Sequence, residues 1–359
     1  MATLRTRSIA ALATGVLILG TGCGTVREPA DTASPTGVTG SDQQAPPVPT
    51  SSVQAASFPS GLSDQTLSVD GVERRYRIHV PADLNEPTAL IVVLHGGGGD
   101  GTSSADDPLD PLAVFREVAD REDAVVVYPQ GLPAKDRAGD RAGWDDCRGD
   151  SEVANGADDT TFLASLITGI GGAFGLDASH TLVTGTSNGA QMAQSLAFAR
   201  PELIGALAIS AGNLPFKPKP GPCTDGPSQA VPILMTHGTA DEMMPYGGGC
   251  VANLSGECNR GRVISSEATL ARWLAINGVT SADVAPTIVE VNSGDSGPAN
   301  RFDYVGTAHV QWWRLDGAGH PVPSKLEGIS ASRVVGPRNT DVEFAEIVWN
   351  FFAPLLPAN

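Results

Sequence analysis

A serine between glycines is the clearest candidate for nucleophilic chemistry in this chain. Residues 185–189 read Gly-Thr-Ser-Asn-Gly. They directly follow the apolar run HTLVT, and their last two residues begin NGAQMAQSL, which has the composition of a helix. A sharp strand-to-helix turn of this kind is a nucleophile elbow, which holds its serine in a strained conformation with the hydroxyl projecting from the edge of a sheet. We therefore predict that Ser187 is a nucleophile.

A serine hydroxyl needs a base that takes its proton and an acid that orients the base. His320, the last of six histidines, lies in the glycine-bearing loop DGAGHP after the apolar run HVQWWRL, and Asp241 lies in MTHGTAD just past VPILM. The order serine, acid, histidine is that of one known arrangement of the triad. Asp225 and Glu242 are rivals for the acid. Asp225 precedes the strand and should lie at its wrong end, and Glu242 should point away from its neighbour.

A tetrahedral intermediate also needs donors for its oxyanion. We expect one to be the backbone N–H of Asn188, next to the serine, and the other to come from LHGGGG, residues 94–99. Gly97 is the chosen donor and Gly98 the alternative, while His95 is expected to brace the loop. No Gly-Lys-Ser/Thr follows the glycines, which excludes a phosphate-binding loop.

Buried strands that alternate with helices must position these groups. The apolar or alternating runs predict strands within 66–81, 89–96, 124–131, 180–185, 206–212, 231–238 and 309–317, and helical spacing predicts helices within 111–123, 157–175, 188–201, 265–278 and 341–352. This pattern indicates an α/β fold with a mostly parallel sheet covered on both faces, in which functional groups gather at the carboxyl ends of the strands. Loops 100–108, 130–157 and 244–262 are expected to shape the pocket.

The first residues resemble a bacterial lipoprotein signal. Arg5 and Arg7 precede an apolar stretch, 9–19, that is too short to span a bilayer, and small residues lead to Cys23. We predict a signal peptide over 1–22, a lipid anchor on Cys23, a disordered tether rich in Pro, Ser and Thr over 23–58, and a catalytic domain over 59–359. Lipid-anchored display on the outer face of the membrane and release into the medium both remain open.

Charge and cysteine content agree with an exported enzyme. The net charge of −17 argues against nucleic acid as a partner, because phosphates are bound by lysine and arginine. In an oxidising compartment the four cysteines after Cys23 suggest two disulfides. The short separation of Cys250 and Cys258 favours a small loop and leaves Cys147 with Cys223. Zinc is the alternative, which no Cys-x-x-Cys pair supports.

The motifs together carry a family resemblance. LHGGGGD, VVYPQG, GWDDC followed by ADDTTF, GTSNGAQMA, HGTADEMMPYGG and GAGHP occur in this order over about residues 66–353. They resemble the polyhydroxybutyrate depolymerase and feruloyl esterase group of α/β hydrolases. The resemblance implies the α/β-hydrolase fold, a triad of Ser187, Asp241 and His320, and an oxyanion hole of Gly97 and Asn188. Members often carry a tryptophan soon after the histidine. Here HPVP stands in its place, and Trp144 supplies either a substrate contact or loop packing.

These observations predict a secreted serine esterase. It would act through an acyl-serine on carboxylic esters, either hydroxyalkanoate polyesters and oligomers or feruloyl-type esters. We expect a monomer that needs no cofactor and no metal. An acyltransferase acting on the cell envelope, a serine peptidase, and a non-catalytic binding lipoprotein are the alternatives.

Overall fold

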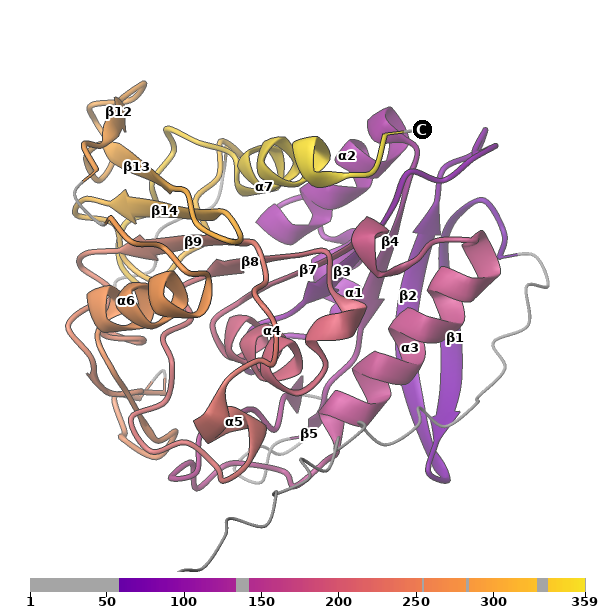
Figure 1. Ribbon diagram of the computed structural model, residues 1–359, viewed down its shortest axis with the longest axis horizontal. Helices are drawn as coiled ribbons and strands as arrows, with labels where there is room; N and C mark the ends of the chain where they lie inside the picture. Colours follow the sequence, from indigo (N-terminus) through magenta and orange to yellow (C-terminus); the bar gives the residue numbers. More distant parts are fainter. Residues whose placement is uncertain (1–57, 134–141, 254, 282–283, 328–334, 359) are drawn as a thin grey trace, which may run out of the picture. The chain divides into compact units, whose positions relative to one another are not determined.

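A twisted, mostly parallel sheet lies at the centre of the protein (Figure 1). The computed structural model describes residues 58–133, 142–253, 255–281, 284–327 and 335–358, all within one compact unit. The predicted signal peptide, Cys23 and residues 23–57 of the predicted tether lie outside the described residues. Phe58, the last residue of that tether, stacks on Phe174 at 5.6 Å between ring centroids. In the part of the chain that is described, no helix has the length and apolar character needed to cross a membrane.

Ten strands of the described chain form this sheet. Across the sheet they are β1 (Gly61–Val69), β2 (Val72–Val80), β4 (Ala124–Pro129), β3 (Ala89–Leu94), β7 (Thr181–Thr186), β8 (Ala206–Ser210), β9 (Ile233–Gly238), β14 (Val310–Leu315), β13 (Ala299–Tyr304) and β12 (Thr287–Val289). The six strands from β4 to β14 run parallel. The pairs at either end are antiparallel. This strand order is that of the α/β-hydrolase fold, which confirms the predicted fold class.

Two apolar layers cover the sheet, and β3 shows why its sequence reads as a continuous apolar run. Leu90, Val92 and Leu94 face one layer, and the alternate residues Ala89, Ile91 and Val93 face the other. Successive side chains of a strand point to opposite faces, so a strand covered on both sides must be apolar throughout.

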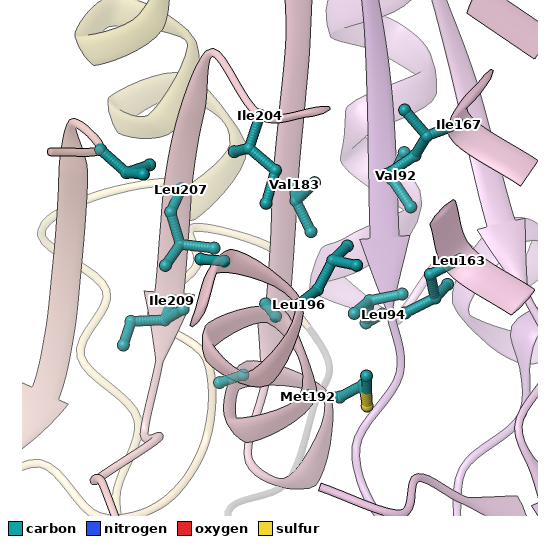
Figure 2. Packing of buried hydrophobic residues seen from close by; sticks show 14 of the residues in the cluster. Val92, Leu94, Leu163, Ile167, Val183, Met192, Leu196, Ile204, Leu207 and Ile209 are labelled. Carbon is teal, nitrogen blue, oxygen red and sulfur yellow. The ribbon is translucent and has the colours of Figure 1, made fainter. Parts of the chain in front are cut away.

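Helices complete each layer (Figure 1). One face is covered by α3 (Asp159–Phe174), α4 (Asn188–Ala199) and α6 (Ser266–Ile276), and the other by α2 (Phe115–Glu122) and α7 (Phe344–Phe352). In Figure 2, Met192 and Leu196 of α4 lie over the strands, beside Leu163 and Ile167 of α3. The helix that follows the predicted nucleophile is therefore held by the core itself.

The remaining elements are short. They are α1 (Gly101–Asp106), α5 (Pro222–Asp225), the strand pairs β5 (Leu132–Pro133) with β6 (Ala142–Gly143) and β10 (Gly249–Cys250) with β11 (Arg262–Val263), and 3-10 turns at Pro111–Val114, Ala178–His180, Pro201–Leu203 and Ala353–Leu355.

The structure departs from the predicted elements in three places. The loop expected at 100–108 holds helix α1, whose first turn is capped by Asp100. Helix α7 begins at Phe344, three residues inside the range 341–352 within which a helix was predicted. Strands β12 and β13 were not predicted. Their outer residues are partly exposed, so they lack the apolar run that marks the central strands.

Candidate active site

Ser187 lies at the junction between β7 and α4, at the carboxyl edge of the sheet. Its backbone has φ 53° and ψ −122°, a conformation that non-glycine residues rarely adopt. The turn is tight because a Cβ on Gly189 would lie 2.3 Å from the carbonyl oxygen of Leu94. The Ser187 N–H donates to the carbonyl of Ser210 at 2.9 Å, which ties the turn to β8. The strained turn predicted from the sequence is therefore present.

Asp241 and His320 meet beside the ends of two neighbouring parallel strands, β9 and β14. Nδ1 of His320 lies 2.8 Å from Oδ2 of Asp241. The other carboxylate oxygen accepts the backbone N–H groups of Met243 and Met244, each at 2.9 Å. Because Oδ2 can only accept, Nδ1 of His320 carries the proton and Nε2 remains the basic nitrogen.

The surroundings of Asp241 keep its carboxyl group ionised. Burial raises the pKa of this carboxyl, but the facing imidazoles of His320 and His237 and their hydrogen bonds outweigh burial and keep the pKa well below its ordinary range. The Asp241 side chain is fully enclosed, whereas that of His320 is 12% exposed. The predicted acid is thus shielded from water, whereas the predicted base is partly exposed to solvent.

The other candidates for the acid and the base lie away from this pair. Asp225 ends α5, which precedes β9, and Glu242 is exposed to solvent. His309 directly precedes β14 and so lies at the strand end opposite to His320. Of the candidates weighed from the sequence, the structure brings together Asp241 and His320.

Ser187 shares the carboxyl edge of the sheet with this pair. Its strand β7 is parallel to β8, which is parallel to β9. Neither the Ser187 hydroxyl nor Nε2 of His320 is hydrogen-bonded to any described residue. In enzymes without ligand, catalytic hydrogen bonds such as the one between serine and histidine are often long, and they shorten when substrate binds.

His237 is a further residue at the site, and the sequence reasoning gave it no role. It is buried at the end of β9. Its Nε2 lies 3.2 Å from Oδ2 of Asp241 and 2.9 Å from the carbonyl oxygen of Met244. Both partners are acceptors, so Nε2 carries a proton and donates to them. The signal was the motif HGTAD, in which histidine and aspartate stand four residues apart.

The glycine loop after β3 packs against the elbow. A Cβ on Gly97 would lie 3.2 Å from Cβ of Asn188, and one on Gly96 would lie 3.5 Å from Cβ of Ser187. The Gly98 N–H donates to the carbonyl of Ala142 at 2.7 Å and is therefore occupied. The backbone N–H groups of Gly97 and Asn188 have no partner among the described residues. This difference favours Gly97 over Gly98 as an oxyanion donor.

His95 braces this loop, as its neighbours show. Its Nδ1 lies 2.8 Å from the Gly96 carbonyl oxygen, and its Nε2 accepts the N–H of Gly131 at 3.1 Å. One ring nitrogen therefore donates and the other accepts, which is the neutral form. Burial lowers the pKa of His95 to about 4, against a smaller opposing effect of the Gly96 hydrogen bond. This histidine stays uncharged at neutral pH.

Residues 142–148, which we call the brace segment, join the glycine loop to the elbow. The Asn188 carboxamide accepts the N–H of Trp144 at 2.7 Å and donates to the Trp144 carbonyl at 3.0 Å. The Trp144 indole N–H donates to the carbonyl of His95 at 2.9 Å. Trp144 is 4% exposed. Its observed contacts are those of loop packing, although the residue also lines the cleft described next.

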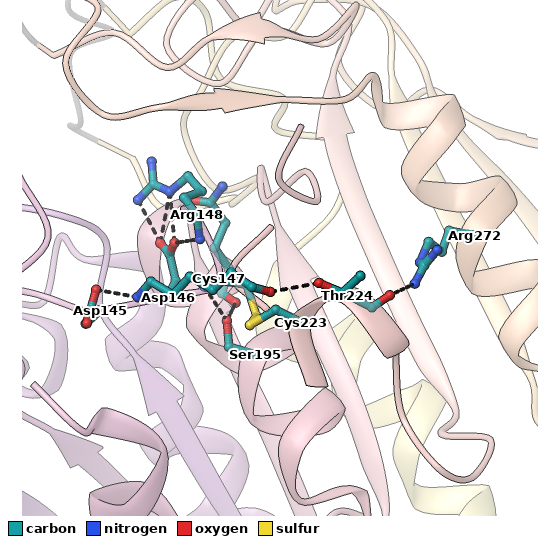
Figure 3. Close-up of a disulfide and its surroundings, with 10 residues drawn as sticks. Asp145, Asp146, Cys147, Arg148, Ser195, Cys223, Thr224 and Arg272 are labelled. Carbon is teal, nitrogen blue, oxygen red and sulfur yellow. Dashed lines mark hydrogen bonds and ion pairs between the residues drawn. A yellow bond between two sulfur atoms is a disulfide. The ribbon is translucent and has the colours of Figure 1, made fainter. Parts of the chain in front are cut away.

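A disulfide fixes the far end of the brace segment. Cys147 is bonded to Cys223, and the Cys147 N–H donates to Oγ of Ser195 on α4 at 2.9 Å (Figure 3). Cys250 is bonded to Cys258. Both pairs are those predicted from the sequence.

A cleft opens beside Ser187. It has a volume of about 520 Å³ counted with the solvent at its mouth. Its wall contains the predicted nucleophile, both expected oxyanion donors and all of the brace segment except Cys147, together with Gln191, Met244 and Val251. A molecule in this cleft would lie beside Ser187, Gly97 and Asn188.

The strand order and the placement of the elbow define an α/β-hydrolase fold with a histidine–aspartate pair at the same sheet edge as Ser187. No family model matches the chain. Its curated relatives include the acetylxylan esterase of Coprinopsis cinerea, 31% identical over 157 residues. Feruloyl esterase D of Neurospora crassa is 23% identical over 298 residues, which are 80% of this chain and 84% of that protein. Such relatives confirm the resemblance to the feruloyl esterase group.

The matched lengths differ between relatives. The Coprinopsis match covers 42% of this chain and 39% of the relative, and for another curated relative the chain spans 48% of the relative's length. Among solved structures, an acetyl xylan esterase from Aspergillus awamori aligns with a TM-score of 0.49 at 19% identity, covering 73% of this chain and 95% of the other.

Proposed function

We propose that this protein is an exported serine esterase that hydrolyses carboxylic esters through an acyl-Ser187 intermediate. The observation that carries the proposal is the 2.8 Å contact between His320 and Asp241 at the same sheet edge as a serine with φ 53°. Strain of this kind persists only where the surrounding structure imposes it, and it is concentrated at functional sites.

The proposed reaction has two halves, acylation of Ser187 and hydrolysis of the acyl-serine, and the same side chains act in both. Nε2 of His320 takes the Ser187 proton as the hydroxyl attacks the ester carbonyl, and the N–H groups of Gly97 and Asn188 stabilise the oxyanion. His320 then protonates the leaving alcohol. In the second half it activates water, which releases the acid and restores the serine. Asp241 keeps the imidazole in the required tautomer throughout.

The substrate is proposed from the relatives and from the family resemblance of the sequence. Relatives are named for acetylxylan and feruloyl esters. We accordingly expect an acetyl, phenolic or hydroxyalkanoate ester, small or part of a polymer, and a monomeric enzyme without cofactor or metal. The two disulfides support maturation outside the reducing cytoplasm. Lipid attachment at Cys23 is proposed from the sequence alone.

A panel of esters tests the proposal. Purified protein should hydrolyse short-chain p-nitrophenyl esters, and methyl ferulate, acetylated xylan and hydroxybutyrate oligomers would rank the acyl groups. Ser187→Ala should abolish turnover and labelling by a fluorophosphonate probe. If Ser187→Ala retains hydrolysis, the assignment of the nucleophile is wrong. If the wild-type protein neither hydrolyses esters nor reacts with the probe, a binding function is favoured instead.

A further inference from the structure

An ion pair in the cleft wall has no role in the reaction as proposed so far. Asp146 and Arg148 both line the cleft that contains Ser187, and their side chains are only 2% and 5% exposed. Nη2 of Arg148 lies 2.7 Å from Oδ2 of Asp146, and Nε lies 3.0 Å from Oδ1. Figure 3 shows the two side chains facing each other beside the disulfide. This is a bidentate pair, the strongest geometry for arginine and carboxylate.

The same carboxylate holds the elbow. Oδ2 of Asp146 accepts a hydrogen bond from Nδ2 of Asn188 at 2.7 Å. With its two bonds to Trp144, the Asn188 carboxamide is fully engaged by the brace segment. The backbone N–H of this residue is the proposed oxyanion donor. Fixing the side chain therefore adds to what holds the backbone of this residue, and with it the N–H, in place.

A carboxylate is a costly anchor at this place. A negative charge close to the nucleophile opposes the negative charge that develops on the oxyanion, and it does so strongly where water is excluded. Arg148 neutralises that charge. Its remaining nitrogen Nη1 donates to the carbonyl of Arg260 at 2.6 Å, which holds the guanidinium in place.

We propose that Asp146 and Arg148 form a positioning pair for the oxyanion hole. Asp146 orients Asn188, and Arg148 keeps the anchor electrically neutral toward the transition state. This inference rests on the proposed function, because it assigns Asn188 as an oxyanion donor. It predicts that removing the arginine alone harms catalysis more than removing both charges.

Three variants test the pair. Loss of one oxyanion donor typically lowers kcat by a factor of 10² to 10³. Arg148→Met leaves the donor present but opposes it with an unpaired negative charge. This variant should therefore lower kcat less, by roughly tenfold to a hundredfold. KM for p-nitrophenyl acetate should change little. The double variant Asp146→Asn/Arg148→Met removes the charge and keeps a carbonyl for Asn188. Its new amino group then faces the backbone N–H of residue 148, which donates to Oδ1 of Asp146 at 2.9 Å, so the variant should recover part of that loss. Arg148→Lys keeps the positive charge and should retain most of kcat.

The assay separates positioning from folding. The concentration of active sites is titrated with a p-nitrophenyl phosphonate, and each rate is divided by it. In a second measurement, the affinity is determined for a boronic acid inhibitor that forms a tetrahedral adduct with serine. Its affinity should fall in step with kcat, which a general loss of folded protein would not cause. Arg262→Gln is the matched control, since Arg262 pairs with Asp150 at 3.4 Å on the surface and is 54% exposed. Its kcat should stay at the wild-type value.

The outcomes are decisive in either direction. Recovery of kcat in the double variant supports the pair. If Arg148→Met does not fold, the comparison is made between Arg148→Lys, which should keep most of kcat, and the folded double variant. The inference is overturned if the double variant is as slow as Arg148→Met, or if Arg148→Lys is as slow as either. The proposed function is tested separately by Ser187→Ala. It stands if that variant is inactive, whatever the result for the ion pair.

Discussion

Replacing Asp241 by asparagine should invert the hydrogen bond on which the base depends. Oδ1 of Asp241 accepts two backbone N–H groups, those of Met243 and Met244. An asparagine should place its oxygen there, because backbone N–H groups can only donate, whereas the imidazoles of His237 and His320 that face Oδ2 can change tautomer. The amino group then occupies the Oδ2 position, where it faces Nδ1 of His320. The imidazole can satisfy this contact only with Nδ1 as acceptor, which moves the proton to Nε2 and leaves no base for Ser187.

The magnitude has two parts. Unit charges about 4 Å apart attract by about 4 kcal/mol at an effective dielectric constant of 20, and this attraction to the imidazolium is lost. At 1.36 kcal/mol for each factor of ten, that part alone lowers kcat by roughly 10³. The wrong tautomer adds to it, and the same exchange in another serine hydrolase lowers kcat by about 10⁴. We expect a fall of roughly 10³ to 10⁴ in kcat with KM little changed.

The assay is initial-rate hydrolysis of p-nitrophenyl acetate at pH 7 to 8, with active sites counted by titration. Glu242→Gln is the matched control, because it removes a neighbouring carboxylate that is exposed to solvent. Its kcat should equal that of the wild type. The reasoning is refuted if Asp241→Asn keeps more than a tenth of the activity, or if Glu242→Gln loses as much as Asp241→Asn does.

Three further predictions concern stability. The pKa of His95 is about 4 in the folded protein and 6.5 when unperturbed, so the unfolded chain binds more protons between these pH values, and stability should fall by about 3 kcal/mol as pH drops from 6.5 to 4. His95→Gln should flatten this part of the pH profile in urea unfolding. The 76-residue separation of Cys147 and Cys223 should make their replacement by alanine cost about 4 kcal/mol. The 8-residue separation of Cys250 and Cys258 should make theirs cost about 2.5 kcal/mol, both read from urea midpoints. Gly172→Ala in α3, where a Cβ would meet nothing within 4 Å, should raise stability by about 0.5 to 1 kcal/mol. Gly189→Ala, with its 2.3 Å clash, should prevent folding.

Each of these can fail in a recognisable way. An unchanged pH slope in His95→Gln would mean that the histidine does not remain neutral in the folded protein. A larger loss from replacing Cys250 and Cys258 than from replacing Cys147 and Cys223 would contradict the loop-entropy argument. A folded and active Gly189→Ala variant would mean that the elbow is looser than the contacts of Gly189 indicate.

Local patterns in the sequence were sufficient for the central sheet. A strand such as β3, covered on both faces, must be apolar throughout, and this leaves a readable run of residues. The elbow was readable because Gly185 and Gly189 are required by close packing: a Cβ at either would lie within 3 Å of backbone atoms. Asp241 and His320 were found because chain order and strand ends restrict where a triad can form.

The parts that escaped prediction depend on contacts between distant segments. Asp146 meets Asn188, 42 residues away, and nothing in GWDDC indicates that partner. His237 donates to Asp241 only because the turn after β9 brings the two side chains together. Strand β13 pairs with β14 near the margin of the sheet, where polar residues are tolerated. Pairing of that kind is decided by the tertiary structure and leaves no period in the sequence.

The backbone of Ser187 also bears on how this chain can evolve. A residue with φ 53° and ψ −122° lies in a region that suits glycine and burdens every other amino acid by about 1 to 3 kcal/mol. Selection for thermal stability alone would favour glycine at this position. The protein would then be more stable but would lack the serine hydroxyl. The serine is therefore kept against a standing pressure, and we expect that an inactive Ser187→Gly protein would melt at a higher temperature than the parent.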